Sequence, residues 1–373
     1  MMEQLKTIRD ASQAAYDASS ALQSNVQNSC DLVARYSELE HKHTQVELSL
    51  KLVQEKLTKA KEETEGKDLR RRYGAWAIVT GPTSGIGRSV ALELASRGLN
   101  LVLVDLNAAN LEISHTVRSR HAVHTKTVVF DLSLVSTAQG DEAMRRLREA
   151  VAGLNGGRPA SPYRELRLCV GVLVNNAGVA KPGAVYLHEA DVEACVRMMR
   201  VNLWAVAEVT AAVLPGMVER GRGAVVNMGS ASSEAIPSFP LHTMYAATKR
   251  YVAQFSRSLY VEYRSKGIDV QCQAPFYVAT RMVSRLAETG RAGRLSMFLI
   301  APTPDAYASA AVRWIGHGPP LCAPNLGHQL LWCLAAVVPD FVHDWLRMRE
   351  HLQHRALAQR PPKRRAGVPT TLK

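Results

Sequence analysis

The chain has little of what a metal site or a disulfide framework needs. Its six cysteines are scattered without any Cys-x-x-Cys spacing, at positions 30, 169, 195, 272, 322 and 333. Several of them lie in apolar runs, so they are expected to be core thiols. The histidines are dispersed as well. The sequence therefore indicates neither a metal site nor a disulfide framework.

Long apolar runs are also missing. A membrane-spanning helix needs roughly 18 uninterrupted apolar residues, and no stretch of the chain reaches that length. The apolar run 330–338 is about half as long. The first residues show no secretory signal pattern. The sequence thus predicts no spanning helix and no secretory signal.

Residues 1–65 contain neither glycine nor proline, which favours one long helix. A heptad seam with Lys and Glu between its positions runs through Leu32, Tyr36, Leu39, His43, Val46, Leu50, Val53, Leu57 and Ala60. This seam predicts a coiled coil used for self-association or docking. The alternative is a lone amphipathic helix of modest stability. Gly66 breaks the helix, and a short charged linker follows at 67–72.

Basic residues outnumber acidic ones by 46 to 33, which gives a formal net charge of +13. Such an excess often indicates a nucleic-acid partner. Residues 1–72 are balanced, however, with twelve basic and twelve acidic side chains, whereas residues 345–373 hold eight Lys and Arg against one Glu. A basic arm after apolar helices fits an anionic membrane surface better, and the alternative is a solvated tail. We therefore expect a peripheral membrane contact and no nucleic-acid partner.

From residue 76 onward, short apolar runs alternate with segments that are long enough for crossover helices. The runs read as buried strands at 76–79, 101–104, 127–130, 172–174, 224–228 and 269–273. The alternation predicts an α/β fold with a doubly wound, parallel sheet of the Rossmann type. Residues 153–162, rich in Gly and Pro, are expected to be a surface loop, and the proline-punctuated residues 283–325 an excursion on the substrate side.

A glycine-rich turn, Thr80-Gly81-Pro82-Thr83-Ser84-Gly85-Ile86-Gly87, follows the first of these strands and precedes a segment with helical spacing. Strand, glycine turn and helix form the context of a phosphate-binding loop, because the free N–H groups of the helix N-terminus face the anion. Gly81 is expected to permit the tight turn, Gly85 the approach of the pyrophosphate, and Gly87 the packing of helix on strand. The alternative is an ordinary αβ turn.

Tyr245 and Lys249 are four residues apart, so on a helix they share one face. A phenol beside an ammonium is expected to have a lowered pKa, which suits proton delivery to a carbonyl oxygen at neutral pH. Alone, this pair is a weak signal, because such pairs are common on solvated helices. It becomes strong here because a dinucleotide-type glycine loop precedes it.

The glycine spacing and the Tyr245/Lys249 pair together resemble the short-chain dehydrogenase/reductase family. Further segments match the family in the expected order: Asn175-Asn176-Ala177-Gly178, Asn202, Ser230 and the nicotinamide loop 275–280. The resemblance covers the chain from about residue 69 onward, and it implies an oxidoreductase that uses NAD(P)H.

The resemblance also implies a role for each residue. Tyr245 would donate its proton to the substrate oxygen, and Ser230 would hydrogen-bond that oxygen. Lys249 would bind the nicotinamide ribose and, with the charge of the oxidised ring, lower the pKa of Tyr245. Asn202 would hold a water that links Lys249 to solvent. The implied coenzyme-binding residues are Gly81, Thr83, Ser84, Gly85, Ile86, Gly87, Asp105, Asp131, Asn176, Ala177, Gly178, Tyr245, Lys249, Pro275, Val278 and Thr280.

The serine assignment has an alternative. Ser230 precedes Tyr245 by fifteen residues and Ser232 by thirteen, and thirteen is the commoner spacing in the family. The strand register favours Ser230, because it lies three residues after Asn227 as in the family. The two extra residues then fall in the loop 234–240. His242 is expected to line the substrate mouth or to be an ordinary loop histidine.

A narrower resemblance, to the plant very-long-chain 3-oxoacyl-CoA reductases, is carried by segments 72–78, 269–282 and 311–316. It implies reduction of a 3-oxoacyl-CoA in fatty-acid elongation at the endoplasmic reticulum membrane, with a homodimer and an elongation complex as expected assemblies. The competing enzyme is a 17β-hydroxysteroid dehydrogenase that acts on a steroid ketone. The competing class is a non-catalytic interaction protein that uses the coiled coil and keeps the reductase fold.

Three parts are expected: a helical or coiled-coil extension at 1–66, the reductase domain at 67–325, and apolar helices with a basic tail at 326–373. The polar N-terminal helix departs from the narrower group, whose members open with an apolar membrane anchor. Its presence indicates either a natural soluble variant or a foreign exon joined at Gly66. The cytoplasm is therefore an alternative location.

Coenzyme preference depends on the end of the second predicted strand. Asp105 stands where a carboxylate bonds the adenosine ribose diol and repels a 2′-phosphate. Leu106 follows, where the plant reductases carry an arginine, and Ser84 offers no basic side chain. These residues favour NADH, whereas the resemblance implies NADPH; the alternative is that Asp105 points into solvent and discriminates little. Asp131 is expected to contact adenine or to cap a turn.

Overall fold

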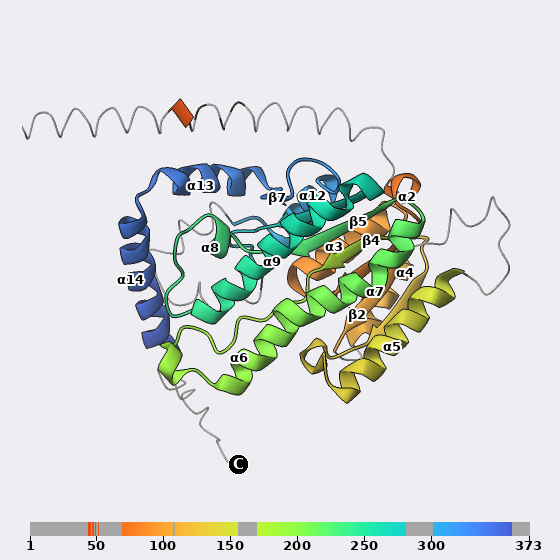
Figure 1. Cartoon of the computed structure of the whole chain (residues 1–373), viewed down its shortest axis with the longest axis horizontal. Coiled ribbons are helices and arrows are strands. Elements are labelled where there is room, and N and C mark those ends of the chain that lie inside the picture. The colour runs from red at the N-terminus through yellow and green to blue at the C-terminus, as the bar shows by residue number, and fades with distance from the viewer. Residues whose placement is uncertain are drawn as a thin grey trace, which may run out of the picture. The chain divides into compact units, whose positions relative to one another are not determined.

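The computed structural model describes residues 44–45, 47, 49, 51, 69–106, 109–155, 170–280 and 301–359. Its parallel strands form one sheet in the order β3-β2-β1-β4-β5-β6-β7 (Figure 1). The strands are β1 (Trp76–Thr80), β2 (Asn100–Asp105), β3 (Thr125–Val129), β4 (Val170–Asn175), β5 (Gly223–Met228), β6 (Ile268–Gln273) and β7 (Leu321–Cys322). The predicted doubly wound fold and its six predicted strands are confirmed, and β7 is an addition.

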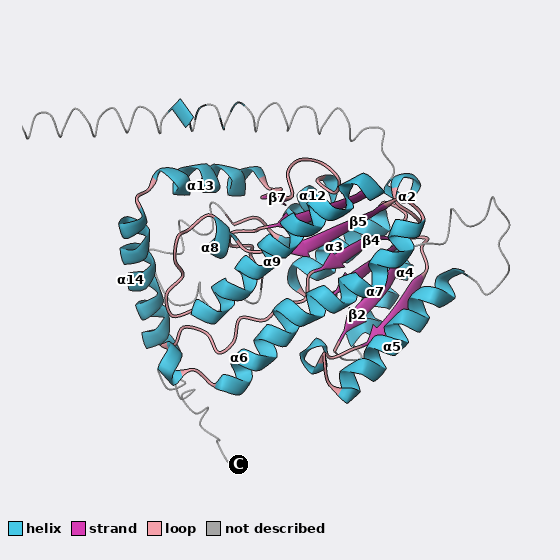
Figure 2. Ribbon diagram, in the orientation of Figure 1, coloured by secondary structure: helices cyan, strands magenta, loops and turns pink. Residues whose placement is uncertain are grey.

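Helices cover both faces of the sheet (Figure 2). One face carries α3 (Gly85–Ser96), α4 (Ala109–Arg120) and α12 (Pro304–Arg313), and the other carries α5 (Ala138–Ala152), α7 (Ala205–Glu219) and α9 (Thr243–Tyr263). Successive strand residues point to opposite faces: Trp76 and Ile78 belong to one core cluster, Ala77 and Val79 to the other. Because both faces are buried, the strands read as continuous apolar runs in the sequence.

Shorter elements connect these layers or follow them. They are α2 (Leu69–Arg72), η1 (Leu132–Leu134), η2 (Gly153–Asn155), η4 (Leu187–Glu189), α6 (Val192–Met199), η5 (Arg200–Trp204), α8 (Ala231–Glu234), η6 (Arg264–Lys266), α13 (Leu326–Val337) and α14 (Asp340–Ala358). The continuous helical segment Val192–Glu219 is long and apolar enough to cross a membrane by length and composition. Half of its apolar window is buried inside the fold, so core packing accounts for its composition.

Residues 301–322 differ from the predicted substrate-side excursion. α12 packs against α3, and its Asp305 accepts a 2.6 Å hydrogen bond from Ser89. Tyr307 of α12 is fully buried in the core on that face of the sheet. β7 then pairs with β6 in parallel. The prediction is wrong here because prolines mark helix starts as well as loops: Pro304 opens α12, a position that suits proline.

Other predictions fall partly or wholly on residues outside the described ranges. The five described positions between 44 and 51 are helical and exposed, and the rest of the predicted coiled coil lies outside the described residues. The same holds for the linker as far as residue 68, for most of the loop predicted at 153–162, for 281–300 and for the basic tail from residue 360.

A buried chain of four polar side chains crosses the middle of the sheet. Asn175 Nδ2 donates to Asn227 Oδ1 at 2.8 Å and to Thr210 Oγ1 at 2.9 Å. Asn227 Nδ2 donates in turn to Ser256 Oγ at 2.9 Å. The two asparagines are register partners in β4 and β5, and the carboxyl ends of these two strands point to the site. These bonds fix that register, because a shift by one residue would leave buried amides without partners.

Candidate active site

A cleft opens at the carboxyl edge of the sheet, beside the point where the strand order reverses between β1 and β4. Ligands of open α/β sheets bind at such a point. The cleft encloses about 1300 Å³ of empty space, open to solvent. All of the predicted coenzyme-binding residues line it except Gly87 and Val278. Val278 lies deeper, 2 % exposed, in the core and in the wall of a second cavity.

The glycine loop adopts the strained turn that its sequence indicates. Gly81 and Gly85 have φ angles of +66° and +55°, a region that favours glycine. Thr280 Cγ2 lies 3.2 Å from the position a Cβ would take on Gly85, which brings the predicted nicotinamide loop beside the glycine loop. α3 begins here, and within the part of the chain that the structure describes the Ser84 side chain makes no capping hydrogen bond. The N–H groups of this helix start therefore face the cleft.

Asn176 holds the glycine loop against β4. Its Nδ2 donates to the carbonyl oxygens of Thr80 and Gly81, both at 3.1 Å. A Cβ on Gly87 would lie 2.1 Å from the Gly81 oxygen and 2.2 Å from Asn176 Nδ2. Gly87 thus permits the close approach of its own backbone to the Gly81 carbonyl and the Asn176 side chain. Asn176 lines the cleft and also positions the glycine loop.

Asp105 also braces this loop. Its Oδ2 accepts from the Thr83 hydroxyl at 2.7 Å and from the Thr83 N–H at 3.3 Å, while Oδ1 accepts from the Leu106 N–H at 2.7 Å. Asp105 is 9 % exposed, so the alternative in which it points into solvent is wrong. Leu106 is exposed beside it. Asp131 accepts from the Ser133 N–H at 2.9 Å, which gives it the capping role, and it lines the cleft as well.

Asn202 lies in η5, a π-helical turn between α6 and α7, and such turns are frequent at functional sites. Its Oδ1 accepts from the Val179 N–H at 2.9 Å, and its Nδ2 donates to the Val179 carbonyl at 2.9 Å and to Thr248 Oγ1 at 3.0 Å. Both amide hydrogens are therefore used, and one lone pair of Oδ1 is left for a water. A Cβ on Gly178 would lie 3.3 Å from Lys249 Nζ and 3.5 Å from this Oδ1.

Lys249 lies on α9 and is buried beside the carboxyl end of β5. Its Nζ donates to the Met228 carbonyl oxygen at 2.8 Å. Burial lowers the pKa of Lys249 to about 8, against a small opposing effect of Cys272. Burial in turn raises the pKa of the Cys272 thiol to about 12, so that group stays protonated. The ammonium therefore loses much of its solvation, and in the part of the chain that the structure describes it has no carboxylate partner.

Tyr245 stands where the cleft meets the second cavity. Burial raises the pKa of its phenol, and a hydrogen bond with Ser230 partly opposes that shift. The predicted lowering is therefore wrong for this arrangement of residues, because loss of solvation outweighs the opposing effect of Ser230. Ser230 begins α8 and lies 2.6 Å from Ser232, oxygen to oxygen. Of the two serines, Ser230 is the one whose interaction lowers the pKa of the Tyr245 phenol, which favours the choice from strand register.

The second cavity has mainly apolar walls and extends from Tyr245 to the C-terminal helices. Its walls include Ser230, Phe276, Tyr277 and His242, so His242 does line this space. Burial, with the nearby His351 and His354, lowers the pKa of His242 to about 4. It is therefore neutral at pH 7.

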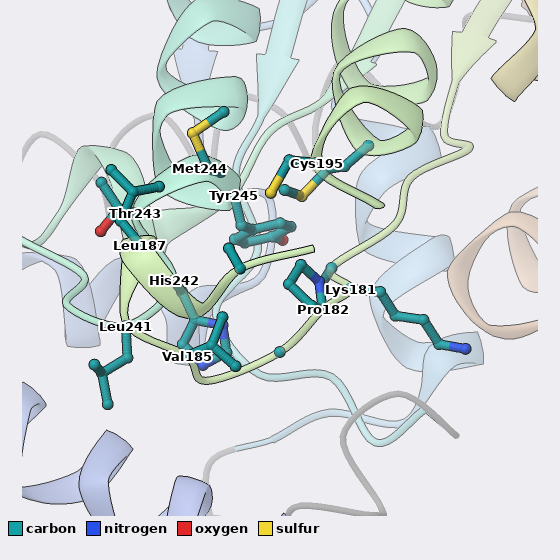
Figure 3. Close-up of a pocket in the computed structure, with 14 residues that line it drawn as sticks. Lys181, Pro182, Val185, Leu187, Cys195, Leu241, His242, Thr243, Met244 and Tyr245 are labelled. Atoms are coloured by element: carbon teal, nitrogen blue, oxygen red, sulfur yellow. The ribbon is translucent and has the colours of Figure 1, made fainter. Parts of the chain in front are cut away.

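A third hollow flanks the other side of Tyr245 (Figure 3). The Tyr245 ring lies between Cys195 and Pro182, with His242 and Val185 beside it, and the Lys181 ammonium points away. Its lining is largely apolar. The Tyr245 phenol thus has a hollow on each side, and both hollows have mainly apolar linings.

The sequence reasoning missed several residues of this site. Thr80 Oγ1 accepts from the N–H groups of Asn176 and Ala177. Tyr277 lines the same cavity as Tyr245 and lies close enough for Tyr245 to contribute to the raised pKa of Tyr277. More distant in the chain, α14 contributes Arg347, His351 and His354 to the cavity wall. Their i, i+4, i+7 spacing marks one helix face, but it does not tell what that face covers. Among the described residues, no group of three or more His, Cys, Asp or Glu side chains is arranged to hold a metal ion.

The residues present fit a dinucleotide. The uncapped start of α3 and the positive-φ glycines form an anion cradle, and Lys249 lies across the cleft from it. The sequence profile described as short chain dehydrogenase matches residues 75–157 and 161–290. A very-long-chain 3-oxoacyl-CoA reductase-like protein of Arabidopsis thaliana is 41 % identical over 290 residues, 77 % of this chain and 85 % of the relative.

Other relatives have two kinds of name. The very-long-chain 3-oxoacyl-CoA reductase of Rattus norvegicus is 36 % identical over 73 % of this chain and 78 % of its own length. The inactive hydroxysteroid dehydrogenase-like protein 1 of Homo sapiens is 35 % identical over 74 % of this chain and 76 % of its own length. The first name corresponds to the 3-oxoacyl-CoA reductase that the sequence indicates, and the second corresponds to its hydroxysteroid dehydrogenase alternative.

Solved structures share the fold. A gluconate 5-dehydrogenase of Burkholderia cenocepacia, in complex with NADP and tartrate, is 26 % identical, with a TM-score of 0.53 over 66 % of this chain and 90 % of that one. A 7β-hydroxysteroid dehydrogenase structure is 21 % identical, with a TM-score of 0.62 over 76 % of this chain and all of that one. The chain therefore belongs to the short-chain dehydrogenase family and is an oxidoreductase that acts on the CH–OH/C=O pair with NAD(P)(H).

Proposed function

We propose that this protein reduces a 3-oxoacyl-CoA to a 3-hydroxyacyl-CoA with NAD(P)H, the reduction step of very-long-chain fatty-acid elongation. The observation that carries the proposal is the meeting of the coenzyme cleft with a mainly apolar cavity at Tyr245 and Ser230. An apolar cavity suits a long acyl chain, and the reductase names of the Arabidopsis and rat relatives support this substrate class.

The catalytic residues would act on the substrate oxygen. The nicotinamide supplies the hydride. Tyr245 donates its proton to the oxygen, and its raised pKa keeps the phenol protonated at neutral pH. Ser230, which lines the same cavity as the phenol, steadies the same oxygen. Lys249 holds the ribose, and Asn202, through its remaining lone pair, holds a water for reprotonation.

We further propose NADH as the preferred coenzyme. The Asp105 carboxylate is buried next to the glycine loop, where it would meet the adenosine ribose, and the exposed Leu106 offers no charge for a 2′-phosphate. NADP bound to the Burkholderia enzyme supports the opposite choice. Initial rates with the two coenzymes decide the question, and a strong NADPH advantage would exclude NADH preference.

A substrate panel tests the reaction itself. Long-chain 3-oxoacyl-CoA and steroid ketones are offered to the purified protein, since the cavity would also admit a steroid and one relative is named for hydroxysteroids. We expect turnover of the acyl-CoA, its loss in Tyr245→Phe, and its retention in Tyr260→Phe, a control on the same helix. Turnover of steroid ketones alone would replace the proposal by the dehydrogenase alternative.

The non-catalytic alternative has support from the relatives named inactive. Against it stands the intact set of Tyr245, Ser230, Lys249 and Asn202. Tyr245 and Ser230 line one cavity, and Lys249 Nζ and Asn202 Oδ1 both lie beside Gly178. Coenzyme binding measured by fluorescence, followed by the substrate panel, separates the two classes. A protein that binds coenzyme and reduces no ketone would favour the interaction role.

We also propose a peripheral contact with the endoplasmic reticulum membrane through α13 and the start of α14. α13 contains no Lys, Arg, Asp or Glu, and its Leu326, Leu330 and Leu334 are exposed at helical spacing. Phe341 and Trp345 continue the apolar surface and are 73 % and 58 % exposed. Aromatic and leucine side chains beside a basic tail suit an anionic bilayer surface.

Flotation with vesicles that contain anionic lipid tests this contact. We expect the wild type to float and a double variant, Leu334→Ser with Phe341→Ser, to stay at the bottom while it retains coenzyme binding. A variant that floats as well as the wild type would exclude this surface. A homodimer and an elongation complex remain the proposed assemblies, and sedimentation of the purified protein measures the first.

A further inference from the structure

The far wall of the second cavity comes from the last described helix. Arg347, His351 and His354 lie at i, i+4 and i+7 on α14, so they share one face, and all three line the cavity that Tyr245 and Ser230 enter from the other side. Two contacts hold α14 in place, one at the middle of this face and one just beyond its C-terminal end. His351 Nδ1 lies 2.6 Å from the Pro240 carbonyl, and Arg355 forms an ion pair with Glu189.

Arg347 is the one Lys, Arg, Asp or Glu side chain among the described residues that line this cavity. Its Nη1 donates to Glu350 Oε2 at 2.5 Å, and Glu350 Oε1 lies 3.5 Å from the Tyr277 hydroxyl. Its Nε is buried, and within the part of the chain that the structure describes this atom has no acceptor. The Arg347 side chain is 26 % exposed although its Nε is buried, so the rest of the guanidinium is the part that can meet a ligand. A charged donor in an otherwise uncharged cavity wall points to an acceptor on that ligand.

The neighbouring histidines are uncharged at neutral pH, so they do not compete with Arg347 as charged donors to a substrate oxygen. Burial lowers the pKa of His242, His351 and His354 below the ordinary value, so the three rings are neutral at pH 7. The His351 Nδ1–H donates to Pro240 when neutral, which leaves its Nε2 as an acceptor. Arg347 is thus the strongest donor on this wall for a substrate oxygen.

We propose that Arg347 binds a carbonyl oxygen of the substrate's thioester arm and so selects 3-oxoacyl thioesters over isolated ketones. This assignment rests on the proposed function. A 3-oxoacyl-CoA carries carbonyl oxygens beyond the one being reduced, first on the thioester and then on the pantetheine amides. An isolated ketone has no second carbonyl to accept a hydrogen bond from the guanidinium. Arg347 is a substrate-binding residue in this assignment and takes no part in proton or hydride transfer.

Three substrates of equal acyl length test the proposal: a long-chain 3-oxoacyl-CoA, its N-acetylcysteamine thioester and a methyl ketone. For Arg347→Gln we expect KM for the thioesters to rise about tenfold or more, because a hydrogen bond from a charged donor is lost. We expect kcat to change less than about twofold and the methyl ketone to be unaffected. Arg347→Lys should restore part of the affinity, since it keeps the charge without the planar fork.

Two further variants separate binding from folding. Arg349→Gln is the matched control: it lies on the same helix, over the exposed ring of Trp345, and should leave every KM unchanged. Glu350→Gln removes the carboxylate that competes for Arg347, and it should lower KM for the thioesters. Equal melting temperatures of the variants exclude a folding defect.

The outcomes distinguish failure of the Arg347 assignment from failure of the proposed function. An effect of Arg347→Gln on the CoA substrate alone places the acceptor on the pantetheine arm, and an effect on both thioesters places it nearer the thioester; both support the assignment. Equal losses on the methyl ketone, or no loss on any thioester, would overturn it while leaving the proposed function intact. If the wild type reduces steroid ketones and no thioester, the proposed function fails and this assignment falls with it.

Discussion

Replacement of Lys249 by methionine should abolish turnover and yet stabilise the fold at neutral pH. Burial lowers the pKa of this ammonium from the ordinary 10.5 to about 8. At pH 7 the unfolded chain and the folded protein both carry the charge, but the folded protein holds it with less solvation. The shift corresponds to about 3 kcal/mol of lost stability. Methionine has a similar length and no charge, so it removes this cost.

A lost hydrogen bond opposes that gain. Lys249 Nζ donates to the Met228 carbonyl at 2.8 Å, and its removal costs about 1–2 kcal/mol. The net expectation is a stabilisation of about 1–2 kcal/mol at pH 7. For a domain of this size that difference raises Tm by roughly 2–4 °C.

The pH dependence identifies the cause. Below pH 8 both states bind the proton and the cost of the buried charge is constant. Between about pH 8 and 10.5 the unfolded chain binds more protons than the folded protein, so the stability of the wild type rises through this window relative to the variant. At pH 10 the cost should have fallen below about 1 kcal/mol, and the variant should have lost its advantage.

Scanning calorimetry at pH 7 and pH 10 measures both differences, and fluorescence titration measures coenzyme binding. Lys266→Met is the control, because Lys266 is exposed and its replacement should give the same difference at both pH values. A Lys249→Met protein that is less stable than the wild type at pH 7 would refute the reasoning. So would a difference that stays constant between the two pH values.

The remaining predictions concern the serine, the coenzyme loop and its specificity. Ser230→Ala should lower kcat by about 100-fold or more, and Ser232→Ala should lower it far less; the reverse order in steady-state assays would assign the role to Ser232. Leu106→Arg should shift kcat/KM toward NADPH by about tenfold, measured by initial rates, and no shift would show that this position does not meet the 2′-phosphate. Gly87→Ala should weaken coenzyme binding by about tenfold or more in fluorescence titrations, because its Cβ would lie 2.1 Å from the Gly81 carbonyl; an unchanged Kd would contradict the close approach.

Local pattern was enough for the sheet and for the glycine loop. Strands buried on both faces leave continuous apolar runs, and the turn after β1 needs glycine at positions 81 and 85 because φ is positive there. β7 was missed because two residues beside Pro320 carry no periodicity. Its existence depends on pairing with β6, which is a tertiary contact.

The chemistry of single groups was harder to predict than their identity. Spacing placed Tyr245 and Lys249 together, but the direction of the Tyr245 pKa shift depends on how much water the fold removes, which spacing does not encode. The part of the cavity wall formed by Arg347 was invisible for a similar reason. About a hundred residues separate it from Tyr245, and only the path of α14 brings both to one cavity.

The buried chain from Thr210 through Asn175 and Asn227 to Ser256 has a consequence for how homologous sequences diverge. Loss of any one member would strand a donor or an acceptor in a dry interior, whereas an apolar replacement of the whole set would be tolerated more easily. Substitutions at these four positions should therefore be strongly epistatic. In an alignment they would appear as correlated columns that switch together between lineages, even though none of the four touches the coenzyme cleft.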